Sequence, residues 1–110
     1  MDQVLLVMTS TPDESSAHDL ASLRADAGFV ACVHILPGMQ SVYRWDGVLH
    51  TTSEVTVQIK TVQSCYAEVE LAVLQSHPYD VPEIIAVPVV DGLPAFLDWV
   101  RQSTTKDRHV

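Results

Sequence analysis

The chain has 110 residues, of which 47% are apolar and only 6% aromatic. This length suits one domain, and the apolar content predicts a compact, mainly aliphatic core rather than disorder. The formal net charge of −8 argues against nucleic-acid and membrane-surface partners, because phosphate groups would be repelled. No run reaches the ~20 apolar residues of a membrane helix, and the start lacks a basic signal region. We therefore expect a cytoplasmic protein.

The N-terminal part of the sequence predicts a strand followed directly by a helix. Residues 3–9 form a nearly continuous apolar run, which is typical of a strand buried on both faces. The segment from Thr11 to Glu14 has the pattern of a capping box, with Thr11 as the N-cap. The helix that begins there is expected to end near Gly28.

The middle of the sequence predicts extended structure. Residues 29–36 read as a second apolar strand, which Pro37-Gly38 is expected to break. Residues 42–60 read as a hairpin whose tight turn is Asp46-Gly47. Its second arm alternates between an apolar side (Val55, Val57, Ile59) and a polar side (Glu54, Thr56, Gln58, Lys60). One face of this arm should therefore be buried and the other polar.

The C-terminal part predicts a helix, a strand and a last short helix. Ser64 can cap the first of these, and His77-Pro78 should end it. Residues 83–90 form a fourth apolar strand, where Pro88 indicates an edge position or a bulge. Residues 94–102 predict the closing helix.

The order of elements predicts a ferredoxin-like fold. A β-α-β-β-α-β order in the α/β (α+β) class, with right-handed crossovers, places both main helices on one face of an antiparallel sheet. Residues 1–110 should form this single domain, with a frayed polar tail from about Ser103. The opposite face would then expose apolar side chains, because three strands are apolar in both alternation phases. We expect other copies of the chain to cover it.

Several short motifs occur in an order that resembles a known family. Ala31-Cys32-Val33, Ser-x-Tyr-x-Trp-x-Gly over residues 41–47 and His-Pro-Tyr-x-x-Pro-Glu over residues 77–83 together resemble the CutA divalent-cation-tolerance family. Further matches are Thr11-Pro12-Asp13-Glu14, Glu54, Ile59-Lys60-Thr61 and Phe96-Leu97-Asp98-Trp99. The matches span essentially the whole chain, and it is their combination that is specific.

The resemblance implies a non-enzymatic homotrimer built through the long hairpin, similar in architecture to the PII signalling proteins. It also implies a link to tolerance of divalent metals, particularly copper, and no organic cofactor. Three departures from the family's usual sequence concern copper binding. Thr9 stands where some members have a cysteine proposed as a copper ligand, His34 replaces an asparagine, and the usual basic, leucine-rich helix end is missing around residues 25–29. A hydroxyl is a poor substitute for a soft thiolate towards Cu(I).

His77 and Glu83 are the metal candidates that the resemblance implies. An imidazole and a carboxylate on one proline-rich loop could converge on Cu or another divalent ion. The alternative is local: His77 caps the helix end, and Glu83 accepts hydrogen bonds from the loop. Two residues without a third ligand more often serve local structure, so any metal is expected to bind weakly.

Five further residues are candidates for a cleft or an interface between subunits: Tyr43, Trp45, Glu54, Lys60 and Tyr79. Trp45 beside the hairpin turn suits an interface anchor. Lys60 could pair with Glu54 or Glu83 of another chain. If subunits meet there, a cleft between them could admit a small anion or metabolite, so a PII-like sensory or scaffolding trimer is the alternative function.

Enzymatic readings have less support. Cys32 and Cys65 have no CxxC spacing and read as free thiols. Cys32 sits mid-strand as a small hydrophobe, and Cys65 opens a helix with no identifiable base. An acylphosphatase of this topology would need an arginine in the loop after the first strand, where Ser10-Thr11-Pro12 has none. RNA binding, another use of this topology, would need aromatic and basic residues on the open sheet, and the sequence does not provide them there.

Overall fold

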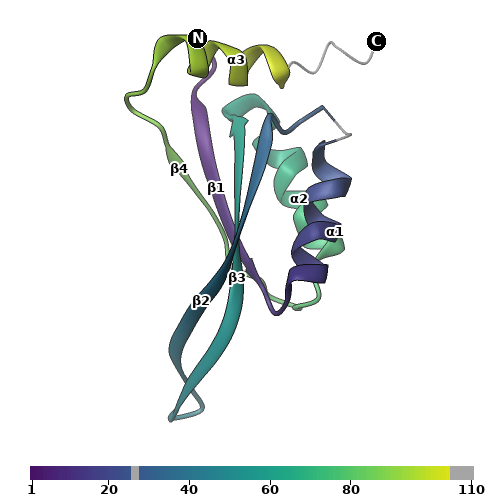
Figure 1. Ribbon diagram of the computed structural model, residues 1–110, viewed down its shortest axis with the longest axis vertical. Coiled ribbons are helices and arrows are strands. Elements are labelled where there is room, and N and C mark those ends of the chain that lie inside the picture. Colours follow the sequence, from purple (N-terminus) through teal and green to yellow (C-terminus); the bar gives the residue numbers. More distant parts are fainter. Residues whose placement is uncertain (26–27, 105–110) are drawn as a thin grey trace.

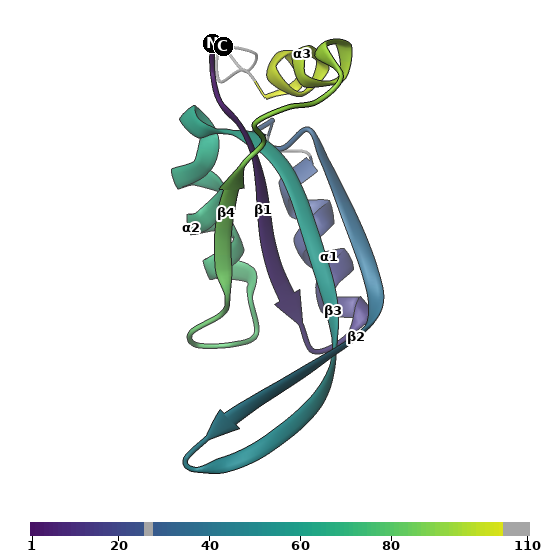
Figure 2. The ribbon, with the colours of Figure 1, turned by 90° about the vertical axis from the view of Figure 1, so that its left-hand side faces the viewer.

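The computed structural model of the chain describes residues 1–25 and 28–104. Its elements are β1 (Val4–Thr11), α1 (Glu14–Ala25), β2 (Cys32–Trp45), β3 (Val48–Val62), a 3₁₀ turn η1 (Gln63–Cys65), α2 (Tyr66–Ser76), β4 (Ile84–Pro88) and α3 (Pro94–Ser103). The four strands form one antiparallel sheet in the order β2-β3-β1-β4 (Figure 2). With α1 and α2 on the same side of it (Figure 1), the predicted ferredoxin-like fold is confirmed.

The main core lies between that sheet and the two helices. Every second side chain of a strand points to the same face of the sheet. Those on the helix side pack against the inner faces of α1 and α2. The buried members of this cluster are Leu5, Val7, Ala17, Leu20, Val30, Val55, Val57, Ile59, Val69 and Val73. The apolar side of β3 is therefore as predicted.

The hairpin of β2 and β3 is longer than the body of the sheet and projects beyond it (Figure 1). Its turn is Asp46-Gly47, as predicted, with φ of 50° and 76° at the two residues. The break predicted at Pro37-Gly38 is wrong, because β2 continues through it with a shift of register between Leu36 and Met39. Gly38, at φ 88°, lets the strand bulge and keep its partner.

Two predicted helix caps are also wrong. The N-cap of α1 is Asp13 rather than Thr11, because an oxygen of its carboxylate accepts the backbone N–H of Ser16 at 2.8 Å. This hydrogen bond lowers the pKa of Asp13. Ser64 does not cap α2; it donates from its hydroxyl and its backbone N–H to the carboxylate of Asp2. At α1 a neighbouring side chain takes the predicted role, whereas at α2 the predicted cap bonds to the N-terminal segment instead.

The C-terminal helix α3 closes one end of the sheet (Figures 1 and 2). Val100 packs with Val4, Val62 and Cys65 in a second buried cluster. Thr104 follows the helix and is buried, so the fraying predicted from Ser103 does not include it. The rest of the predicted tail, residues 105–110, lies outside the described residues. No described helix is long and apolar enough to cross a membrane.

The sheet face away from α1 and α2 is half apolar and half polar. Apolar side chains on β1 and β4 occupy one half: Leu6, Met8, Ile85 and Val87. Polar side chains on β2 and β3 occupy much of the other half: His34, Thr56, Gln58 and Lys60. The predicted apolar open face is thus continuous on β1 and β4, while on β2 the exposed Leu36 lies among polar neighbours.

Candidate functional site

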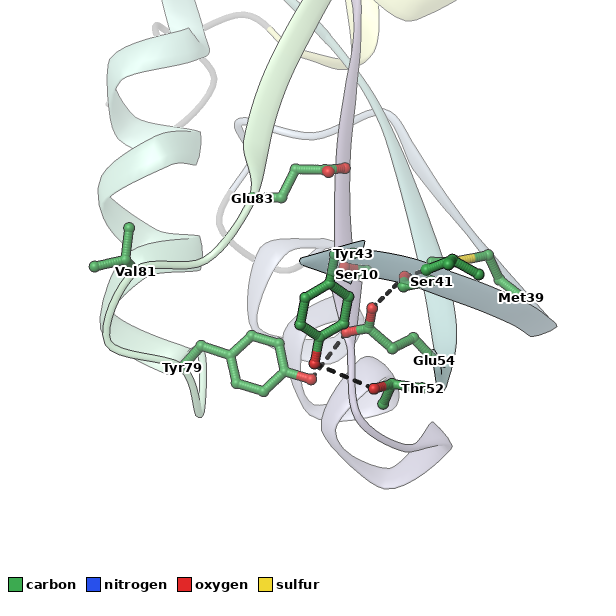
Figure 3. Close-up of a pocket in the computed structure, with 10 residues that line it drawn as sticks. Ser10, Met39, Ser41, Tyr43, Thr52, Glu54, Tyr79, Val81 and Glu83 are labelled. Atoms are coloured by element: carbon green, nitrogen blue, oxygen red, sulfur yellow. Dashed lines mark hydrogen bonds between the residues drawn. The ribbon is translucent and has the colours of Figure 1, made fainter. Parts of the chain in front are cut away.

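A cavity of about 590 Å³ lies between the hairpin and the segment that joins α2 to β4 (Figure 3). The hairpin bends across the foot of the sheet towards that segment, so residues far apart in sequence share one wall (Figure 2). The lining residues come from β1, β2, β3 and the α2–β4 connection: Ser10, Met39, Ser41, Val42, Tyr43, Thr52, Glu54, Tyr79, Val81 and Glu83. This volume is typical of small-ligand sites.

Ser41, Glu54 and Tyr79 form a polar wall of the cavity, with Glu54 at its centre. The side chain of Glu54 is only 9% exposed, and each carboxylate oxygen accepts one hydrogen bond. Ser41 on β2 donates to one oxygen, and the hydroxyl of Tyr79 donates to the other at 2.9 Å (Figure 3). Because both oxygens act as acceptors, the geometry suits a carboxylate. The network also joins the hairpin to the α2–β4 connection.

Two tyrosines approach this wall from opposite sides. The hydroxyl of Tyr43 lies 3.2 Å from that of Thr52, across the hairpin. Burial raises the pKa of Tyr79 to about 12, and its hydrogen bond to Glu54 acts in the same direction. Tyr79 therefore remains a hydrogen-bond donor at neutral pH.

The cavity carries negative charge without a basic partner. Glu83 lies just before β4 and lines the same cavity as Glu54. None of the described lining residues is a lysine, an arginine or a histidine. Ligands with positive charge are therefore favoured there.

His77 holds the end of α2 to β1. Its Nδ1 accepts the backbone N–H of Tyr79 at 3.1 Å, so Nε2 carries the hydrogen and donates to the carbonyl of Ser10 at 2.7 Å. The side chain is buried and its ring tilts against that of Tyr79. Both ring nitrogens are thus engaged with the backbone, one with β1 and the other with the loop after Pro78. The metal-binding role of His77 and Glu83 stays a prediction.

The structure brings four of the predicted site residues together at the cavity: Tyr43, Glu54, Tyr79 and Glu83. Trp45 lies apart at the hairpin tip, with 67% of its surface exposed. Lys60 lies on the open face, where its Nζ is 3.0 Å from Nδ1 of His34.

Sequence reasoning missed several lining residues, and two of them had a usable signal. Ser41 precedes Tyr43 by two positions in β2, and Thr52 precedes Glu54 by two in β3, so each pair shares a strand face. The contributions of Ser10 and Val81 depend on how the hairpin bends, which strand periodicity does not reveal.

Thr9 faces away from the cavity. Adjacent strand residues point to opposite faces; Ser10 lines the cavity, while Thr9 lies opposite Val57 of the two-helix core. Its hydroxyl is buried and has no hydrogen-bond partner among the described residues. Within residues 1–25 and 28–104, no three His, Cys, Asp or Glu side chains gather where they could hold a metal ion.

Known proteins resemble this chain over nearly all of its length. The profile of the family described as CutA1 divalent ion tolerance protein matches residues 5–103. The divalent-cation tolerance protein CutA of Thermus thermophilus is 36% identical over 104 residues, which cover 94% of this chain and 99% of that protein. Some plant and mammalian relatives are longer, and the chain spans about half of their length.

Solved structures show the same fold. CutA1 from Oryza sativa has a TM-score of 0.91 at 34% identity, covering 96% of each chain. A protein described as the periplasmic divalent cation tolerance protein CutA, from Archaeoglobus fulgidus, has a TM-score of 0.88 at 29% identity, covering 93% of this chain and 99% of that one.

Proposed function

The chain belongs to the CutA1 divalent ion tolerance protein family, and from this premise we propose that it is a non-enzymatic homotrimer that protects cells against divalent metal ions such as copper. The observation that carries the proposal is the family match over residues 5–103. The test is growth: a bacterium without its own CutA protein should tolerate less copper, and this chain should restore its tolerance. Failure of the well-expressed chain to restore growth would contradict the proposal.

The proposed metal ligands are His77 and Glu83. Ligation by His77 has to break one of its two backbone hydrogen bonds, so binding of Cu(II) or Zn(II) should be weak. Calorimetric titration should show lower affinity in Glu83→Gln and in His77→Ala. Unchanged affinity in a folded Glu83→Gln variant would remove this site.

Trimer formation is supported by the apolar surface of the single chain. Large apolar side chains are exposed on the open sheet face and near the hairpin tip, among them Trp45, Val48, Leu49, Ile85 and Val87. Soluble monomers rarely expose contiguous apolar patches of this kind. The outer strands β2 and β4 also leave backbone groups for pairing with a neighbour.

The cavity favours a second candidate function, a PII-like sensory or scaffolding role with a small molecule as ligand. Its volume of about 590 Å³ falls within the range of metabolite sites and exceeds the space that one metal ion fills. A thermal-shift screen of metal ions against small metabolites would separate the two functions. Stabilisation by a metabolite alone would favour the sensory role.

A cytoplasmic location is also proposed for this chain. Both cysteines are free thiols, and free thiols persist in reducing compartments. Fractionation of cells that express the chain with its native start would test the proposal, and recovery in the periplasm would contradict it.

A further inference from the structure

The polar wall of the cavity concentrates negative charge, and the described lining residues include no cationic side chain. Glu54 is largely withdrawn from water, and its two oxygens receive hydrogen bonds only from the hydroxyls of Ser41 and Tyr79 among the described contacts. Neutral donors offset part of the cost of burying a carboxylate, while an opposite charge offsets more. Glu83 adds a second acidic group to the same cavity.

The rest of the wall suits an organic ligand better than a bare ion. Met39, Val42 and Val81 contribute apolar side chains, and Tyr43 and Tyr79 contribute aromatic rings. Methylene groups gain free energy when they leave water against such surfaces. Aromatic rings also attract ammonium groups through their negative faces.

The hydroxyls complete a site for a charged hydrogen-bond donor. The side-chain oxygens of Tyr43 and Thr52 lie 3.2 Å apart on the same wall as Glu54 (Figure 3). Each has lone pairs that can accept, and an ammonium group offers three donors to share among them. A metal ion would need more charged or imidazole ligands than these described residues bring to one point.

We propose that the cavity binds a small organic cation, a primary ammonium on a short aliphatic chain, with the ammonium group at Glu54 and the chain against Met39 and Val81. The inference rests on the second candidate function above, that the cavity admits a small molecule. The ligand should carry a positive charge at one or both ends of a short aliphatic chain.

The experiment is calorimetric titration of the full chain at constant ionic strength. The probes are 1,4-diaminobutane, n-butylammonium and the neutral isostere 1-butanol. Both ammonium probes should bind, and 1-butanol should not. Glu54→Gln should weaken ammonium binding about tenfold, because it removes one charge from a partly dehydrated site. Glu83→Gln should also weaken ammonium binding. Because Glu83 is exposed, this variant should stay folded even if Glu54→Gln does not.

The matched control is Asp91→Asn, which removes the same charge from the exposed connection between β4 and α3, at the end of the sheet opposite the hairpin (Figure 1). It should leave ammonium affinity within about twofold of the original, because solvent and salt screen a distant charge. No binding of either ammonium probe, equal binding of 1-butanol, or equal losses in Asp91→Asn and Glu83→Gln would each overturn the inference.

A parallel titration with Zn(II) separates this inference from the metal proposal. Zinc binding without ammonium binding would overturn the inference and leave the metal proposal standing. Ammonium binding without zinc binding would support the inference and contradict the metal site at His77 and Glu83.

Discussion

Thr9 is a polar residue in an apolar position. It is 1% exposed within the two-helix core, and its hydroxyl finds no partner. A buried hydroxyl without a hydrogen bond loses its contact with water and gains nothing in return. The buried hydroxyl of Thr9 therefore lowers the stability of the fold.

Replacing that hydroxyl should stabilise the protein. Thr9→Val keeps the shape of the side chain, and we expect the free energy of unfolding to rise by about 1 kcal/mol. The matched control is Thr61→Val, because Thr61 is also buried but donates to the carbonyl of Phe29. The control should lose about 1 kcal/mol. Urea denaturation of both variants measures the difference, and a loss in Thr9→Val would contradict the prediction.

Two tyrosines should make the fold sensitive to alkali. Burial raises the pKa of Tyr66 and of Tyr79 from 10.0 to about 12, with hydrogen bonds to Glu70 and Glu54 in support. The folded chain then keeps protons that the unfolded chain has lost, so their contribution is complete below about pH 10 and falls between about pH 10 and 12. Tyr79→Phe should flatten this fall in urea denaturation. An unchanged slope would contradict it.

The long hairpin shows which parts of an element the sequence could predict. The alternation of Val55, Val57 and Ile59 identified the buried side of β3, and Asp46-Gly47 identified the turn, because both signals are local. The interruption at Pro37-Gly38 was misread, since only the partner strand determines whether an extra residue breaks a strand or bulges from it. The caps were misassigned for two other reasons: Asp13 and Thr11 are equally suitable by residue type, and Ser64 bonds to Asp2, 62 positions away.

The candidate site was harder to predict than the fold. Glu54 and Tyr79 were identified as cleft candidates, but their shared hydrogen bond joins positions that are 25 residues apart. Such a contact depends on the bend of the hairpin towards the α2–β4 connection (Figure 2). No spacing in the sequence encodes that bend.

The hairpin should be sensitive to backbone changes that cause no clash. At Gly47 and Gly38 an added Cβ would meet nothing within 4 Å, yet both residues have φ between 76° and 88°. Such angles cost an L-residue roughly 1 kcal/mol or more. Gly47→Ala and Gly38→Ala should therefore lower the free energy of unfolding by about that amount. Urea denaturation measures it, and Gly47→Asn should recover part of the loss because asparagine tolerates positive φ.

At the scale of the whole molecule, the proposed trimer can be tested through the open sheet face. Ile85 on β4 is 48% exposed there, and Ile85→Glu would place a charge in the proposed contact. Light scattering should give three times the 12.1 kDa mass of one chain for the original protein, and a single chain mass for the variant.

The control is Leu71→Glu, which makes the same kind of change on the outer side of α2, where the side chain is 56% exposed. It should leave the mass unchanged. A single chain mass for the original protein at micromolar concentration would contradict the trimer, as would an unchanged mass for a folded Ile85→Glu variant.

The buried position of Cys65 allows the detachment of α3 to be followed by thiol alkylation. Its thiol is fully buried and donates to the carbonyl of Thr104, just beyond that helix, at 3.0 Å. An alkylating reagent can reach the sulfur only when this end of the chain detaches, so the rate of modification reports the frequency of that local opening. Half-buried Cys32, on β2, provides an internal reference in the same molecule.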